Sequence, residues 1–168
     1  MVGAKGGNPV RLEGRRAIVT GGASGIGQAV SVALAREGAD VLIADRQDAS
    51  ETLAAIEVFG HTAASTLCDL AAGEQVTAMV NEAVGRLGYV DTLVQCAGVI
   101  VFKPFLDTTE ADWDKQMNTN AKAMFLVGRA VAAVMSEAHG GRVVNISSVA
   151  ADRGHLDLSA YCASKAAV

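Results

Sequence analysis

The chain has 168 residues, 51% of them hydrophobic and 19% charged, with a formal net charge of −4. This length suffices for one domain with a core, and the composition excludes a highly charged disordered protein. The acidic balance argues against a nucleic-acid or anionic membrane surface, and no hydrophobic run reaches the roughly 18 residues of a membrane span. Residues 1–11 predict a flexible, Gly-rich segment that lacks the apolar stretch of a signal peptide, which favours a cytoplasmic protein.

Residues 12–168 predict one α/β domain in which short apolar runs alternate with helical patterns. Strands are expected at residues 17–20, 41–45, 62–67, 92–95 and 142–146, and helices at 25–38, 51–59, 73–85, 110 to about 139, and from 159 onwards. Thr108 or Thr109 is placed to cap the long helix. In the first helix, the apolar pattern predicts a buried face made of Ile26, Val30, Ala33 and Leu34. This alternation predicts a doubly wound parallel sheet that binds its ligand beyond the carboxyl ends of the strands.

A glycine-rich turn, residues 20–27 (TGGASGIG), joins the first strand to the first helix. Gly21, Gly25 and Gly27 lack the side chains that would block a sharp turn or the approach of a pyrophosphate. The helix N-terminus that follows, which includes Ile26, offers free N–H groups to phosphates, and Ser24 could add a hydroxyl donor. The turn therefore predicts a dinucleotide site.

Asp45 ends the second predicted strand. A carboxylate at this place can accept hydrogen bonds from the adenosine ribose hydroxyls and would repel the 2′-phosphate of NADP. Arg46 follows directly and could instead pair with that phosphate. Because Asp45 is nearest the expected ribose position, the sequence favours NAD over NADP as the cofactor.

Tyr161 and Lys165 are spaced to share one face of the last predicted helix. A phenol titrates near about pH 10, and a neighbouring ammonium favours the phenolate, which makes an acid–base catalyst of the tyrosine. Ser148, just past the fifth strand, could hydrogen-bond a substrate oxygen, and Ser147 is the competing assignment.

The glycine turn, the serine and the Tyr-x-x-x-Lys motif, in this order and spacing, resemble the short-chain dehydrogenase/reductase family from about Leu12 to the last residue. The resemblance implies a Rossmann-like fold and hydride transfer between a nicotinamide cofactor and a secondary alcohol or ketone. In that reaction Tyr161 would move the proton, Ser148 would hold the oxygen, and Lys165 would orient the ribose and tune Tyr161. Asn120 matches the family's helix-embedded asparagine, which helps to hold a proton-relay water.

The resemblance also extends the predicted cofactor site to residues after the third and fourth strands. Asp69 and Leu70 look like the adenine-contacting pair, and Ala97 and Gly98 match the small residues beside the ribose. Residues 95 and 96, Gln-Cys, depart from the family's Asn-Asn, which puts the bracing of this loop by the sheet in doubt. Tyr161 and Lys165 are expected to contact the cofactor as well.

Members of this family are longer, so the chain is expected to be incomplete on its C-terminal side, with the fifth strand left as an edge. A sugar acid or polyol is the favoured substrate class, with a 3-oxoacyl thioester or a steroid as open alternatives. The alternative to an enzyme is a truncated nucleotide-binding or interaction module without turnover. The family implies a homodimer or homotetramer at full length. No metal site is expected, and three unpaired cysteines predict reduced thiols.

Overall fold

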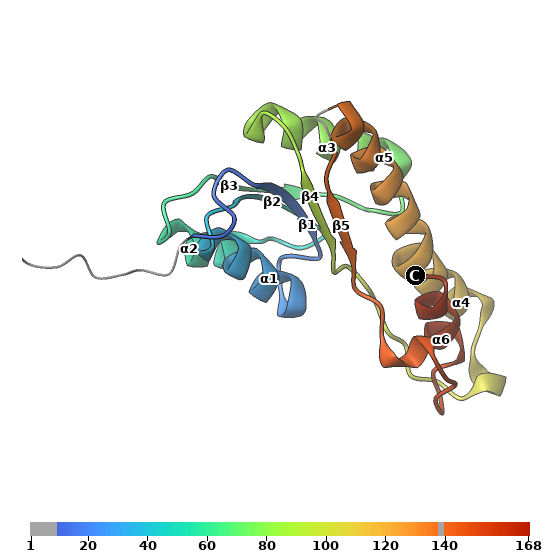
Figure 1. The fold of residues 1–168 in the computed structure, drawn as a ribbon. Coiled ribbons are helices and arrows are strands. Elements are labelled where there is room, and N and C mark those ends of the chain that lie inside the picture. The colour runs from blue at the N-terminus through green and yellow to red at the C-terminus, as the bar shows by residue number, and fades with distance from the viewer. Residues whose placement is uncertain (1–9, 138–139) are drawn as a thin grey trace, which may run out of the picture.

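A computed structural model describes residues 10–137 and 140–168 and shows five parallel strands with helices on both faces (Figure 1). The strands are β1 (Arg16–Thr20), β2 (Asp40–Asp45), β3 (Ala63–Leu67), β4 (Thr92–Gln95) and β5 (Arg142–Asn145), in the order β3-β2-β1-β4-β5. The chain winds outwards in both directions from β1, which confirms the predicted doubly wound sheet and places the reversal of strand order between β1 and β4. Residues 1–9 of the predicted flexible segment lie outside the described residues, and Arg11 forms an ion pair with Glu37.

Six α-helices follow the predicted positions within a few residues. They are α1 (Gly25–Arg36), α2 (Ser50–Glu57), α3 (Gly73–Leu87), α4 (Glu110–Gln116), α5 (Ala123–Glu137) and α6 (Ser159–Ala166). Gly38 and Gly60 follow α1 and α2 and have φ values of +100° and +75°. Glycine adopts a positive φ without a steric clash, and such a residue ends a helix. No helix among the described residues is long and apolar enough to cross a membrane.

Two apolar layers form the core, one on each face of the sheet. Alternate strand residues point to opposite faces, so Val19 and Ile43 pack beneath α1 and α2, whereas Ile18 and Leu42 pack against α3 and α5. Figure 1 shows the same division, with α1 and α2 on one side of the strands and α3 and α5 on the other. Covering both faces explains why the middle residues of β1, β2 and β4 are consecutive apolar residues.

The predicted buried face of the first helix is only partly correct, since Val30 and Leu34 pack half-buried against the core. The residues of α1 that are buried are Gly27, Ser31 and Ala35, whereas Ile26 is 64% exposed and Ala33 is exposed. Small residues at this spacing let the helix approach the glycine turn closely, and a Cβ on Gly27 would overlap the carbonyl oxygen of Gly21. Close backbone approach therefore selects the most buried residues of α1, and the apolar side chains of Val30 and Leu34 pack beside them.

The long predicted helix is continuous but changes its geometry midway. It begins at Glu110, where Thr109 is the N-cap and forms a reciprocal capping box with Asp112. A π-helical stretch, Met117–Lys122, separates α4 from α5, and the predicted end near His139 lies outside the described residues. The wider turn, which the apolar pattern did not predict, contains the buried Asn120.

β5 forms one edge of the sheet, as predicted. All four of its residues are exposed, including Val143 and Val144. Burial of nearly every strand residue is therefore a property of β1, β2 and β4 and not of this edge strand.

Candidate active site

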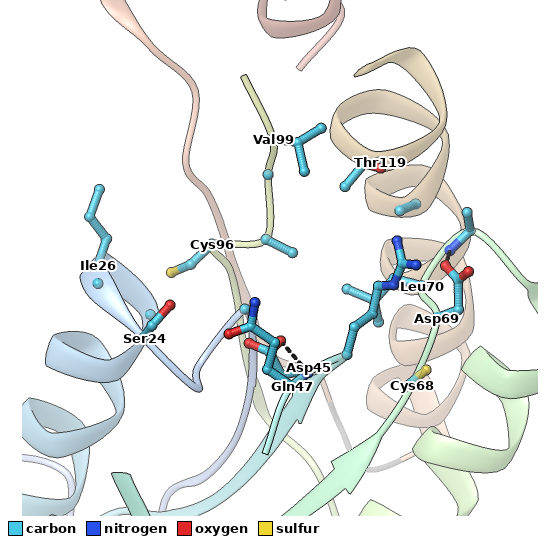
Figure 2. Close-up of a pocket in the computed structure, with 18 of the residues that line it drawn as sticks. Ser24, Ile26, Asp45, Gln47, Cys68, Asp69, Leu70, Cys96, Val99 and Thr119 are labelled. Atoms are coloured by element: carbon cyan, nitrogen blue, oxygen red, sulfur yellow. Dashed lines mark hydrogen bonds between the residues drawn. The ribbon is translucent and has the colours of Figure 1, made fainter. Parts of the chain in front are cut away.

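A crevice of about 670 Å³ opens at the carboxyl ends of β1, β2, β3 and β4 (Figure 2). Eleven residues predicted from the sequence to bind the cofactor line it: Gly21, Ser24, Gly25, Ile26, Gly27, Asp45, Arg46, Asp69, Leu70, Ala97 and Gly98. They come from four separate strand ends, which meet only because the strands are parallel. The sheet thus brings these eleven residues to one crevice, whereas Tyr161 and Lys165, also predicted to contact the cofactor, are not in its lining.

The glycine turn forms one wall of the crevice. Gly21 has a φ of +69°, and a Cβ there would lie 2.7 Å from the Cα of Ala97, so only glycine fits between β1 and the β4 loop. Ser24 is the N-cap of α1, and its exposed side chain makes no capping hydrogen bond. Figure 2 shows Ser24 and Ile26 along this wall. The free hydroxyl and the α1 N-terminus together suit a bound phosphate.

Asp45 is held in one orientation at the end of β2. Its Oδ2 accepts the Ala23 N–H at 3.0 Å, and its Oδ1 accepts the Gln47 N–H at 3.0 Å, as the dashed line in Figure 2 marks. Arg46 is exposed and also lines the crevice. A fixed carboxylate and an exposed guanidinium, carried by consecutive residues, therefore line the crevice where the adenosine ribose was predicted to bind.

Asp69 follows β3 on the opposite wall. Its Oδ1 accepts the Ala71 N–H at 3.0 Å, and its own N–H donates to Gln75 Oε1 at 2.7 Å, so the turn that carries Leu70 is fixed at both sides. Burial, with a smaller effect of Asp69, raises the pKa of the Cys68 thiol to about 11. Cys68, Cys96 and Cys162 are all free thiols, as predicted.

The loop after β4 is braced by the sheet although Cys96 replaces the family's asparagine. Gln95 Nε2 donates to Asn145 Oδ1 on β5 at 3.0 Å, and Thr20 Oγ1 on β1 accepts the Ala97 N–H at 3.3 Å. The doubt about the bracing of this loop is therefore answered by Gln95 and Thr20, which need no contribution from the Cys96 side chain.

Asn120 ties the β4 loop to α6. Its Oδ1 accepts the Val99 N–H at 2.8 Å, and its Nδ2 donates to the Val99 carbonyl and to Ser164 Oγ, both at 2.9 Å. Because Ser164 precedes Lys165, Asn120 connects the rim of the crevice to the helix that carries the predicted catalytic pair.

Lys165 is 5% exposed, and its Nζ donates to the Ile146 carbonyl at 2.9 Å. Nζ lies 6.0 Å from the centre of the Tyr161 ring, and a Cβ on Gly98 would lie 3.4 Å from it. Burial lowers the pKa of Lys165, and the nearby Cys96 has the opposite effect. The ammonium is thus close both to the Tyr161 ring and to Gly98, which lines the crevice.

The two candidate serines have different partners. Ser147 Oγ donates to the Lys165 carbonyl at 2.8 Å, so its hydroxyl anchors α6. Ser148 Oγ accepts the Ala150 N–H at 3.2 Å and caps a short 3-10 turn, Val149–Ala151. The proton of Ser148 remains available as a donor.

The crevice lining does not include Tyr161, Ser148 or Lys165. Gly98 is the lining residue that Lys165 and Asn120 approach, since a Cβ on this glycine would lie 3.4 Å from Lys165 Nζ and 3.3 Å from Asn120 Oδ1. Sequence reasoning missed lining residues Gln47, Cys68, Ala71, Cys96, Val99, Lys115, Thr119 and Ala123. The last three share one face of the long helix at i, i+4 and i+8, a spacing that could have identified them.

Comparison with known proteins agrees with this geometry. The family model for short chain dehydrogenases matches residues 15–168. The 2-dehydro-3-deoxy-D-gluconate 5-dehydrogenase of Escherichia coli (strain K12) is 34% identical over 158 residues, which cover 94% of this chain and 62% of that protein. The D-threitol dehydrogenase of Mycolicibacterium smegmatis is 39% identical, with coverages of 92% and 60%.

A solved structure of 7α-hydroxysteroid dehydrogenase, complexed with NADH and 7-oxo glycochenodeoxycholic acid, superimposes with a TM-score of 0.89 at 34% identity. The match covers 95% of this chain and 63% of that one. This chain therefore spans about three fifths of the length of the proteins it matches. By the match over residues 15–168, the fold and the order of its motifs, the chain belongs to the short-chain dehydrogenase family.

Proposed function

We propose that this chain is the cofactor-binding and catalytic part of an NAD-dependent dehydrogenase that interconverts a secondary alcohol and a ketone. The observation that carries the proposal is the position of Lys165. Its ammonium approaches Gly98 on the crevice floor while its helix also carries Tyr161. The predicted catalytic helix therefore meets the predicted cofactor crevice at one residue.

The crevice fits a dinucleotide by its shape as well as by its motifs. Side chains are absent at Gly21 and Gly27, where a Cβ would collide with backbone, and the Ser24 hydroxyl is free at the α1 N-terminus. Asp45 would hold the ribose hydroxyls, and Asp69 and Leu70 would contact the adenine. When bound, the nicotinamide ring supplies the hydride acceptor.

The residues of this chain would position the alcohol and move its proton. Ser148, whose oxygen already accepts the Ala150 N–H, donates its hydroxyl proton to the substrate oxygen. Tyr161 accepts the proton of the substrate hydroxyl in oxidation and returns it in reduction. Ser147 is engaged with the Lys165 carbonyl, which supports Ser148 as the substrate contact.

Lys165 uses one of its three N–H donors on the Ile146 carbonyl, which leaves two for the ribose and for a water chain. Its Nζ lies 6.0 Å from the centre of the Tyr161 ring. Asn120 lies beside the same ammonium at Gly98, which supports the proton-relay role that the family resemblance implies.

NAD is the proposed cofactor because the Asp45 carboxylate is fixed by two backbone N–H groups and would face a 2′-phosphate with like charge. The solved relative with bound NADH supports this choice. Arg46 is the residue that would favour NADP.

A small polyol or sugar acid is the proposed substrate class, supported by the two relatives named for 2-dehydro-3-deoxy-D-gluconate and D-threitol. One observation favours a steroid as the second candidate. Val149 and Leu156, on the segment between Ser148 and Tyr161, are 73% and 88% exposed and would suit an apolar ring system. A homo-oligomer is proposed for the full-length protein, on the family resemblance.

The test is to assay the full-length protein with NAD⁺ and NADP⁺ on D-threitol, 2-dehydro-3-deoxy-D-gluconate and a 7α-hydroxysteroid. We expect NAD⁺-linked turnover with one of the first two. Tyr161→Phe should lower kcat by about 10²–10⁴-fold, because it removes the acid–base group, while NADH still binds. Undiminished turnover by Tyr161→Phe would refute the mechanism. NADH binding without turnover on any alcohol would favour a nucleotide-binding module.

A further inference from the structure

The segment that leaves β4, Val99–Lys103, behaves as a strand although it pairs with no strand. Its side chains alternate, with Val99, Val101 and Lys103 half-buried and Ile100 and Phe102 exposed by 45% and 68%. This period of two is that of an extended chain lying against a surface. The surface is the helix that contains α4 and the π-helical stretch.

Three side chains on that helix each bind one residue of the segment, and we call these three contacts the ladder. Asn120 Oδ1 accepts the Val99 N–H at 2.8 Å, and Gln116 Oε1 accepts the Val101 N–H at 3.1 Å. Asp112 Oδ2 accepts from Lys103 Nζ at 2.6 Å. Helix positions 112, 116 and 120 thus pair in reverse order with segment positions 103, 101 and 99.

The match of the two spacings explains why these residue types are found there. Four residues of an α-helix rise about 6 Å, and two residues of an extended chain span about 6.6 Å. This match aligns Gln116 with the Val101 N–H and Asp112 with the Lys103 side chain. Asn120, in the π-helical stretch, accepts the Val99 N–H. Gln116 is 1% exposed, and its Nε2 donates to the Asp112 carbonyl at 3.3 Å, which fixes the amide in the orientation that presents oxygen to Val101.

The far end of the segment is tied to the loop that precedes Tyr161. The Lys103 N–H donates to the Asp157 carbonyl at 2.8 Å, and Asp157 has a φ of +60°, a strained value for a residue other than glycine. At its near end, Val99 lines the cofactor crevice, where Figure 2 shows it facing Thr119. The segment therefore runs from the crevice to the loop between Ser148 and Tyr161.

We propose that Gln116 is a positioning residue that, through the Val101 N–H, fixes the segment Val99–Lys103 as one wall of the substrate site. In this segment the side chains of Ile100 and Phe102 point away from the helix. There they contact the non-reacting part of the substrate. Gln116 touches neither substrate nor cofactor and acts only through the segment. The expected effect on substrate kinetics rests on the proposed dehydrogenase function. The hydrogen bond between Gln116 and Val101 can be tested without any turnover.

The first measurement is the amide hydrogen exchange of Val101, followed by NMR in the full-length protein. Gln116→Met keeps the volume of the buried side chain and removes the acceptor, so exchange at Val101 should speed up by about fivefold. Gln116→Glu should restore protection, because burial raises the pKa of a carboxyl and the neutral acid can accept from Val101 and donate to the Asp112 carbonyl. Asn118→Ala, an exposed position in the same helix, is the matched control and should leave Val101 unchanged.

The second measurement is the kinetics of NAD⁺-linked oxidation of D-threitol, or of whichever alcohol in the panel above turns over. Gln116→Met should raise the KM of the alcohol by about fivefold, with kcat and the KM of NAD⁺ within twofold of wild type, and Gln116→Glu should restore the alcohol KM. Unchanged Val101 exchange in Gln116→Met would refute the ladder. Faster exchange with an unchanged alcohol KM would refute the positioning role. A wild-type protein that oxidises no alcohol would count against the proposed function. The exchange data would still show whether Gln116 protects the Val101 N–H.

Discussion

Gly27 lies where the first turn of α1 passes over the strand-to-helix turn. A Cβ at this position would overlap the carbonyl oxygen of Gly21, and the atoms it meets are backbone, which cannot rotate away. The same absence of volume brings α1 close enough to offer its N-terminal N–H groups to a phosphate. Both the stability of the fold and the binding of the cofactor therefore depend on residue 27 being a glycine.

Gly27→Ala should destabilise the protein by about 2–4 kcal/mol and lower its affinity for NADH by more than tenfold, because α1 must move away from the turn. Urea unfolding and NADH fluorescence titration measure the two effects. Gly73→Ala at the start of α3 is the matched control, since a Cβ there meets nothing within 4 Å. Its stability should stay within about 1 kcal/mol of wild type. Equal effects of the two substitutions would contradict the steric argument.

We expect Asp45 to decide by its charge between the two nicotinamide cofactors. Asp45→Asn keeps the side-chain shape and an oxygen acceptor, but removes the negative charge that would face a 2′-phosphate beside Arg46. The ratio of kcat/KM for NADP⁺ to that for NAD⁺ should rise by at least about tenfold. Asp48→Asn, which removes an exposed carboxylate outside the crevice lining, should leave the ratio unchanged. No rise in Asp45→Asn would mean that Asp45 does not face the phosphate position.

At the scale of elements, Asp91 joins the amino ends of β1 and β4. Its Oδ1 accepts the Arg16 N–H at 3.1 Å and the Thr92 hydroxyl at 2.9 Å, and its Oδ2 accepts from Arg15 Nη1 at 2.9 Å. Burial alone raises the pKa of Asp91. The hydrogen bonds and the Arg15 charge together lower the pKa by more than burial raises it, so the pKa of Asp91 lies below its ordinary value. The carboxylate thus stabilises the folded state in its charged form.

This shift predicts a defined loss of stability in acid. Because the folded-state pKa lies below the unfolded one, the contribution of Asp91 is complete above the unfolded pKa of about 4 and is lost as the pH falls through the folded value. Asp91→Asn should lower the free energy of unfolding by about 1–3 kcal/mol at pH 7, and this difference should shrink below about pH 4. Urea unfolding of both proteins from pH 7 to pH 3 tests this. A difference that stays constant with pH would show that Asp91 acts through shape alone.

At the scale of the whole molecule, the crevice is formed by several elements together and not by any one of them. Its lining comes from the ends of four strands, from α1 and from the long helix, so a ligand there contacts both halves of the doubly wound sheet. Ligand binding to the folded state alone shifts the unfolding equilibrium by mass action.

NADH at about 100 times its Kd should therefore stabilise the protein by about 2.7 kcal/mol and raise Tm by roughly 5–10 °C. NADPH at the same concentration should raise Tm less, because of Asp45. Thermal unfolding followed by the fluorescence of Trp113, the single tryptophan, measures both shifts. No shift with either nucleotide would contradict the assignment of the crevice.

Local patterns predicted the strands and helices well because each depends on neighbours in sequence. The third helix begins at the predicted Gly73, and β4 has the predicted bounds. The α1 face was only partly right. Close backbone approach buries Gly27, Ser31 and Ala35, whereas the predicted Ile26 and Ala33 are exposed. The π-helical turn around Asn120 was not predicted, since it depends on contacts with Val99 and Ser164 on other elements.

By itself, the sequence determined the parallel α/β order, the motifs at the strand ends and the family that they imply. These are properties of residue types at fixed spacings, which hydrophobic periodicity and turn chemistry make readable. Only the tertiary structure decided that Lys165 and Asn120 meet at Gly98, that Ser147 anchors α6 while Ser148 stays free, and that Gln116 holds the β4 loop. Such contacts join segments up to tens of residues apart, and a spacing along the chain does not encode the distance between two side chains that folding brings together.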